Sequence, residues 1–178
     1  MAESHFNVCT IIIFAHSSFV VGKLNYFNKK DNDNPTLKTL EKIPVFKNLN
    51  KKELTEVVRL THERVYKKDE FVFKKMAPAE GMYILLEGEV KITDTDSKTI
   101  FAELQSGDFF GELALLDEEP RSASAIATTS AKLIGFFRTD LLTLIKRYPE
   151  LGNKILLNLS KVLGERLRRT NIELAKPS

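Results

Sequence analysis

The sequence is short of the residues that build disulfides and metal centres. Cys9 is the only cysteine among 178 residues, so an internal disulfide is excluded and a reducing compartment is indicated. The three histidines, His5, His16 and His62, precede the strands predicted below. A metal-dependent barrel enzyme needs histidines and carboxylates clustered on its strands. We therefore expect no metal site and no metal enzyme, and we interpret Cys9 as an inert apolar residue.

Long apolar runs are also missing. In residues 9–22 the longest unbroken run is Ile11–Ala15, far below the roughly 20 residues that cross a bilayer. Glu3 and His5 stand where a signal peptide would carry lysine or arginine. We therefore expect a cytoplasmic protein with no membrane span. The β-branched residues of 9–22 leave three interpretations open: an added strand, a partner-binding segment or an extension without function.

The overall composition fits one domain with extensions. Hydrophobic residues make up 43% of the chain, enough for a core, and the net charge of +3 neither requires nucleic acid nor excludes a small anion. Residues 28–35 are polar and end in proline, which is typical of a linker. We predict an N-terminal extension and linker over 1–34 and a folded domain over 35–178.

Helical patterns flank a region of strands. Residues 36–42 predict a short helix that ends before Pro44, and Asn50 with Glu53 resembles a capping box at the start of an amphipathic helix. Residues 139–150 predict a helix capped by Thr139. A longer helix after Pro149 would place these residues on one face: Leu151, Ile155, Leu159, Val162, Leu163 and Leu167. We predict C-terminal helices over 139–173.

Between these helices, short apolar runs alternate with turns over about residues 63–138. The runs are rich in Val, Ile, Phe and Tyr and occupy residues 64–68, 71–75, 81–94, 99–104, 122–129 and 132–137. Short strands without interleaved helices are typical of an antiparallel sandwich or barrel. The predicted fold class is therefore α+β: an antiparallel, jelly-roll-like β-roll with one helix before it and two after it. Tyr83 and Val90 are expected to pack in its interior.

The stretch FFGELALLDEEPRSASA, residues 109–125, carries the strongest chemical signal. Gly111 permits close backbone approach, and the first N–H groups of the turn after it can face an anion. Arg121 is a planar fork that matches phosphate oxygens, and Glu112 can accept from a hydroxyl. The simplest alternative is that Glu112 and Arg121 pair with each other. Small residues from Ser122 to Ala125 leave room for a ligand, which favours a pocket for a phosphate beside a sugar hydroxyl.

This stretch resembles the phosphate-binding cassette of the cyclic nucleotide-binding domain family, which includes catabolite activator proteins and protein kinase A regulatory subunits. The cassette pattern F-G-E-[LI]-A-L followed by P-R-[AST]-A is met from Phe110 to Ala123. Residues 81–92, GMYILLEGEVKI, are similar to a glycine-rich hairpin of the family, and the resemblance covers about residues 45–165.

The resemblance implies a cyclic nucleotide ligand, cAMP in preference to cGMP, and no other cofactor. It implies that Glu112 accepts from the ribose 2′-hydroxyl and that Arg121 binds the cyclic phosphate. Backbone amides would complete the phosphate site, at Gly111, Leu113, Ala114 and Ala123. Ser122 would lie near the base without deciding which base binds.

The resemblance also implies that the C-terminal helix covers the base as a lid. The matching turn contains Val162, Leu163 and Arg166, and Arg166 would stack on the base while Leu163 covers it. The alternative is that Leu163 packs on the barrel and Arg166 is solvated. Residues 155–170 would then stay unchanged when ligand binds.

The remaining alternatives concern what the domain does with a ligand. A nucleotide hydrolase is not indicated, because the chain has no G-x-x-x-x-G-K-[ST] loop and the cassette has no nucleophile with a base. We therefore expect a binding module and no catalytic residues.

A transcription regulator would carry a helix-turn-helix, but only eight residues follow Thr170, so nucleic-acid binding would require a truncated chain. A ligand-free scaffold of the same fold stays open. No residue of the sequence indicates which protein receives the signal. A homodimer formed through the C-terminal helix stays open.

Overall fold

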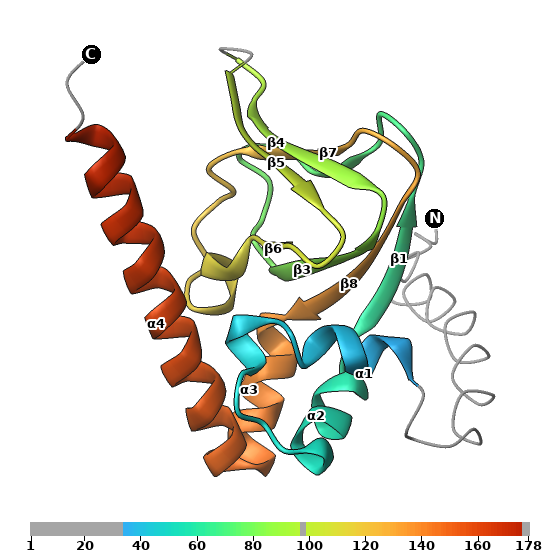
Figure 1. The fold of residues 1–178 in the computed structure, drawn as a ribbon, viewed down its shortest axis with the longest axis vertical. Coiled ribbons are helices and arrows are strands. Elements are labelled where there is room, and N and C mark those ends of the chain that lie inside the picture. The colour runs from blue at the N-terminus through green and yellow to red at the C-terminus, as the bar shows by residue number, and fades with distance from the viewer. Residues whose placement is uncertain (1–33, 97–98, 176–178) are drawn as a thin grey trace, which may run out of the picture. The chain divides into compact units, whose positions relative to one another are not determined.

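The computed structural model describes residues 34–96 and 99–175, in which helices lie before and after two β-sheets (Figure 1). The helices before the sheets are α1 (Pro35–Leu40), the 3₁₀ helix η3 (Pro44–Phe46) and α2 (Lys51–Val58), and those after them are α3 (Arg138–Arg147) and α4 (Pro149–Leu174). Residues from Pro35 onward form one compact unit. The predictions for Cys9 and for residues 9–22 lie outside the described residues.

Each sheet has four strands. The first has the order β1 (His62–Tyr66), β8 (Ala131–Phe137), β3 (Gly81–Glu87) and β6 (Phe109–Phe110). The second has the order β2 (Phe71–Phe73), β7 (Ser124–Ala127), β4 (Glu89–Asp94) and β5 (Thr99–Gln105). All pairs are antiparallel, which confirms the predicted β-roll, although in the described residues the strands form two sheets and no closed barrel. The two-residue strand β6 was not predicted.

Strand β3 separates two hydrophobic cores. Met82 and Ile84 belong to the core shared with the helices, whereas Tyr83 and Leu85 belong to the core between the sheets. This division follows from strand geometry, since successive side chains point to opposite faces. Both faces are covered, so the strand reads as a continuous apolar run. Tyr83 and Val90 are buried in the inter-sheet core, as predicted.

The predicted start of α2 is confirmed by a complete capping box. The Asn50 side chain accepts from the Glu53 N–H at 3.0 Å, and the Glu53 carboxylate accepts from the Asn50 N–H at 2.8 Å. The same Glu53 carboxylate pairs with Lys154 Nζ of α4 at 2.6 Å. Thus α2 is both capped and joined to the last helix.

The structure corrects three predictions, two of them in the C-terminal helices. Thr139 is not the cap of α3, because the helix begins at Arg138 and Asp140 accepts from the Phe137 N–H at 3.0 Å. Leu167 is 63% exposed, because the last turns of α4 extend beyond the helical core. His62 does not precede the strands, since it is the first residue of β1. No described helix is long and apolar enough to cross a membrane.

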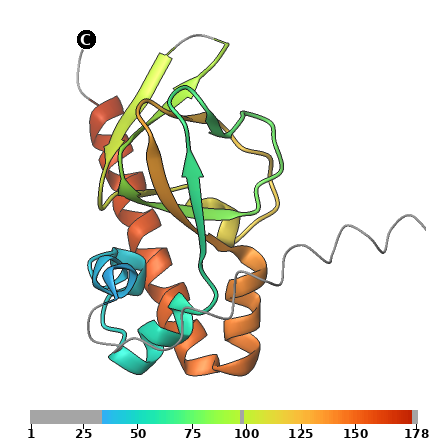
Figure 2. The same cartoon turned by 90° about the vertical axis from the view of Figure 1, so that its right-hand side faces the viewer.

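Asn158 fixes the N-terminal half of α4. Its buried side-chain amide donates to the carbonyl of Val45 at 3.2 Å and to the carbonyl of Lys47 at 2.7 Å. From this anchor α4 leaves the other helices and runs along one side of the β-roll, as both ribbon views show (Figures 1 and 2). The fold therefore places the second half of α4 beside the segment that follows β6.

Candidate ligand-binding site

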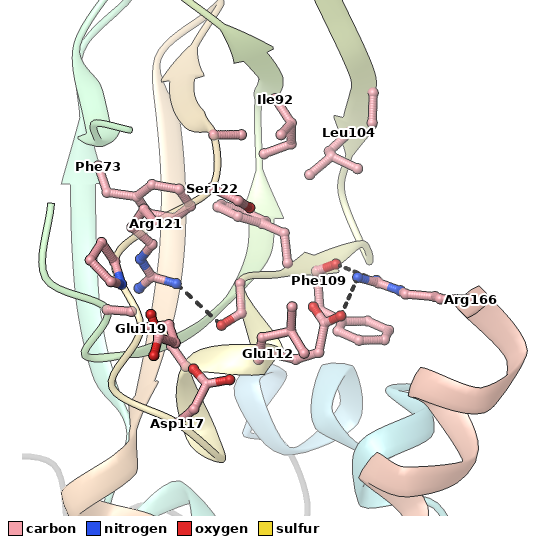
Figure 3. Close-up of a pocket in the computed structure, with 18 of the residues that line it drawn as sticks. Phe73, Ile92, Leu104, Phe109, Glu112, Asp117, Glu119, Arg121, Ser122 and Arg166 are labelled. Atoms are coloured by element: carbon pink, nitrogen blue, oxygen red, sulfur yellow. Dashed lines mark hydrogen bonds and ion pairs between the residues drawn. The ribbon is translucent and has the colours of Figure 1, made fainter. Parts of the chain in front are cut away.

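A pocket of about 520 Å³ lies between the β-roll and α4 (Figure 3). This volume is within the range of small-molecule sites. One wall is apolar and consists of Phe73, Ile92, Ala102, Leu104, Phe109 and Phe110. The remaining wall contains the predicted cassette and two arginines of α4, Arg166 and Arg169. The described residues contain no cluster of His, Cys, Asp and Glu that could hold a metal ion.

Gly111 begins the short 3₁₀ helix η4 (Glu112–Leu115) in a left-handed conformation, with φ of 73°. A Cβ atom here would lie 2.7 Å from Arg121 Nη1, so any larger residue would force the guanidinium to shift. The Ala114 N–H donates to the Gly111 carbonyl at 3.2 Å. The predicted ligand contact of that amide therefore requires the turn to open.

Arg121 is buried beneath the pocket, with 7% of its surface exposed. Its Nη2 donates to the Gly81 carbonyl at 2.6 Å, its Nη1 donates to the Gly111 carbonyl at 3.2 Å, and its guanidinium carbon lies 4.1 Å from the centroid of the Phe73 ring. The Nε–H is buried and has no protein acceptor in the described structure. Burial is the main cause that lowers the pKa of Arg121.

The environment of Arg121 is incomplete for a buried cation. Within the described part of the chain, no carboxylate lies at ion-pair distance from it. A buried charge is costly unless it is paired and hydrogen-bonded. The unpartnered Nε–H and the positive charge both favour an anionic acceptor in the pocket.

Glu112 has a different partner from the one that the simplest alternative predicted. Its side chain is 5% exposed, and its Oε1 accepts from Arg166 Nη1 at 2.6 Å. Arg166 also donates to the Phe109 carbonyl at 3.1 Å, and its guanidinium carbon lies 4.8 Å from the Phe109 ring centroid. The suggested pairing of Glu112 with Arg121 is therefore wrong. Figure 3 shows that Arg166 reaches Glu112 from α4, across the pocket from Arg121.

The other predicted site residues are divided between the pocket and the core. Leu113, Ser122 and Ala123 line the pocket. Val162 is buried in the helical core and Leu163 packs against the same core, so Arg166 is the one member of the predicted lid that lines the pocket. Arg169 was not predicted, although it lies three residues after Arg166 and hence on the same helix face.

Comparison with known proteins agrees with this geometry. The family model of the cyclic nucleotide-binding domain matches residues 63–148, which include all eight strands apart from the first residue of β1. Residues 63–148 belong to the cyclic nucleotide-binding domain family. The chain is 33% identical over 134 residues to the cyclic AMP receptor protein of Thermus thermophilus, covering 74% of this chain and 60% of that protein.

Other matches include a potassium channel and two solved structures. A cyclic nucleotide-gated potassium channel of Rhizobium etli is 31% identical over 113 residues, which are 64% of this chain and 31% of the channel. The crystal structure of the Thermus thermophilus catabolite activator protein aligns with a TM-score of 0.66 and 32% identity, over 74% of this chain and 62% of that chain. A cyclic nucleotide-binding domain from Methylobacillus flagellatus aligns with a TM-score of 0.68 and 27% identity, over 81% and 84% of the two chains. The chain thus spans less than two thirds of the length of these curated relatives.

Replacing Gly111 with alanine should destabilise the protein more than the same change at Gly107. Both glycines have positive φ, where a Cβ costs about 1–2 kcal/mol, but an added Cβ at Gly107 meets nothing within 4 Å. At Gly111 the Cβ also collides with Arg121. Urea denaturation should show a loss of about 1 kcal/mol for Gly107→Ala and at least about 1 kcal/mol more for Gly111→Ala. Equal losses would contradict the close approach of Arg121.

Proposed function

We propose that this domain binds a cyclic nucleotide, cAMP in preference to cGMP, and that it is a regulatory binding module and not an enzyme. The observation that carries the proposal is the buried Arg121, whose Nε–H lacks a protein acceptor beside a pocket of nucleotide size. A cyclic phosphate carries one negative charge and oxygens that can accept from the guanidinium. One ligand charge therefore balances one buried protein charge.

The ribose end of the ligand would meet Glu112. Arg166 occupies one carboxylate oxygen of Glu112, and the second oxygen has no protein partner in the described structure. An ionised carboxylate is an acceptor only, so this oxygen suits a hydroxyl that donates. The ribose 2′-hydroxyl is the donor that a cyclic 3′,5′-phosphate leaves free. Arg166 and the hydroxyl can therefore bind the same carboxylate together.

The base would lie against the apolar wall. Ile92, Leu104 and Phe109 offer an apolar surface, and the exposed Ser122 offers a hydroxyl that can donate or accept. These residues do not select adenine over guanine by hydrogen bonding. The preference for cAMP is supported by the relatives, among them the cyclic AMP receptor protein of Thermus thermophilus.

We also propose that α4 transmits the presence of ligand. Arg166 contacts Glu112 and Phe109 inside the pocket, while Asn158, two turns earlier, anchors the helix to the η3 segment. A ligand that alters Glu112 therefore acts directly on α4. Exposed apolar surface for an output partner is supplied by Leu157, Leu167 and Ile172. A second copy of the chain is one candidate for this partner.

A ligand-free scaffold is the second candidate. It is favoured by the ion pair with Arg166, because this pair gives Glu112 a partner without any ligand. Arg121 has no such partner. The two functions are separated by the binding experiment below.

Arg121→Ala should weaken cAMP binding at least about 100-fold. Charge-assisted hydrogen bonds contribute about 1.5–3 kcal/mol each, and a bidentate phosphate contact makes two of them. Calorimetric titration of wild type, Arg121→Ala and the exposed control Arg59→Ala with cAMP and cGMP measures this loss, and Arg59→Ala should bind like wild type. Absence of binding to the wild type would favour the scaffold. Binding by Arg121→Ala within a few-fold of wild type would contradict the phosphate assignment.

Glu112→Ala and removal of the ligand 2′-hydroxyl should not be additive, because both changes remove the same contact. Each change alone should weaken binding, and the two together should weaken it little further. The measurement is a double cycle of dissociation constants for wild type and Glu112→Ala with cAMP and 2′-deoxy-cAMP. Additive losses would show that Glu112 does not bind the ribose.

Saturating cAMP should protect residues 155–170 from hydrogen exchange, because the bound ligand stabilises the contact between α4 and the pocket. Residues 51–58 of α2 serve as a segment that should not respond. Arg166→Ala should remove the added protection, whereas Arg168→Ala, an exposed arginine outside the pocket, should retain it. Unchanged exchange over 155–170 at saturation would contradict transmission through α4.

A further inference from the structure

Two acidic side chains lie on the Arg121 side of the pocket. Asp117 and Glu119 line the pocket and belong to the loop from η4 to β7 that also carries Arg121. Figure 3 shows both carboxylates on the side that Arg121 occupies and away from Arg166. Negatively charged side chains repel an anion, so their presence in an anion site calls for an explanation.

The neighbouring acid on this loop behaves differently. Glu118 pairs with Arg138 at 2.5 Å and does not line the pocket. Within the described residues, neither Asp117 nor Glu119 forms an ion pair, so neither charge is neutralised by a direct partner. Burial lowers the pKa of Arg121, whereas electrostatic interactions with Tyr83, Glu80 and Glu112 raise it, so Glu80 is a further carboxylate that acts on this charge.

The charges at this end of the pocket therefore fit a singly charged ligand. Arg121 supplies one buried positive charge, and its unpartnered Nε–H, in a side chain that is 7% exposed, provides independent evidence for an anion there. The single negative charge of a cyclic phosphodiester balances the positive charge of Arg121. A phosphomonoester at pH 7 carries about 1.5–2 negative charges, because its second pKa is about 6. The additional charge would lie beside Asp117 and Glu119 and across the pocket from Arg166.

We propose that Asp117 and Glu119 are specificity-determining residues that exclude nucleotides with an open, doubly charged phosphate, such as 5′-monophosphates. This selection rests on the proposed binding of a cyclic nucleotide at the same site. Discrimination between ligands often depends on a repulsive element as well as on attractive contacts. Here the attraction comes from Arg121 and the repulsion from the two carboxylates. Both come from one short loop.

Solvent screening limits the size of the effect. Both carboxylates are exposed, and exposed charges a Debye length apart interact weakly. Two such charges acting on one added ligand charge should change its affinity about 5- to 30-fold at low salt. The effect should shrink strongly at 0.5 M salt, about the range where the Debye length falls below 5 Å.

The test compares 5′-AMP with cAMP on wild type, on the double variant Asp117→Asn with Glu119→Gln, and on the control Glu118→Gln. The quantity measured by calorimetric titration at low salt is the ratio of the two dissociation constants, AMP to cAMP. The double variant should lower this ratio about 5- to 30-fold, with AMP gaining more affinity than cAMP. The control should leave the ratio within about twofold, since Glu118 already has a cationic partner.

The outcomes separate this selection from the proposed function. A ratio that the double variant leaves unchanged, with cAMP still bound, would overturn the selection alone. An equal decrease in Glu118→Gln would also overturn it, because the effect would then follow net charge and not the pocket. Absence of cAMP binding to wild type would overturn the proposed function and the selection together.

Discussion

The burial of one positive charge is the constraint on which the rest of the site depends. Arg121 is held by carbonyls of Gly81 and Gly111 and by the face of Phe73, which come from three separate parts of the β-roll. Glycine at 111 suits this contact, because a Cβ there would force the guanidinium to shift. In the described structure the protein supplies these contacts to Arg121 but no carboxylate at ion-pair distance, and the Nε–H has no acceptor. A bound anion would balance the buried charge and accept from this N–H.

The second arginine of the pocket connects the site to the helices. Arg166 joins Glu112 to α4, and Asn158 joins the same helix to the segment after α1. A change at Glu112 can therefore reach the helical core through one continuous element. The exposed turns of α4 beyond Leu163 lie outside that core and are the part of the helix best placed to respond.

Local patterns predicted most of the fold, whereas long-range partners were not predictable. The capping box of Asn50 and Glu53 and the strand runs depend on residues near in sequence, and the structure confirms them. The two-residue strand β6 is too short to leave a pattern, and it exists because it pairs with β3. The Glu112–Arg166 pair joins residues 54 positions apart, so neither residue type nor spacing could show that Glu112 prefers Arg166 to Arg121. The helical periodicity placed Leu167 on the same face as the buried residues of α4. A residue on that face is buried only where another element packs against it, and the last turns of α4 extend beyond the helical core.

We propose that a nucleotide phosphate accepts a hydrogen bond from the Arg121 Nε–H. Proton–nitrogen correlation spectra that resolve arginine Nε–H groups test this directly, with Arg121→Lys used to assign the signal. Saturating cAMP should move the Arg121 Nε–H signal strongly downfield, as expected for a new charge-assisted hydrogen bond, and leave the signal of the exposed Arg59 in place. An Arg121 signal that stays unchanged while cAMP is bound would show that the phosphate does not accept from this N–H.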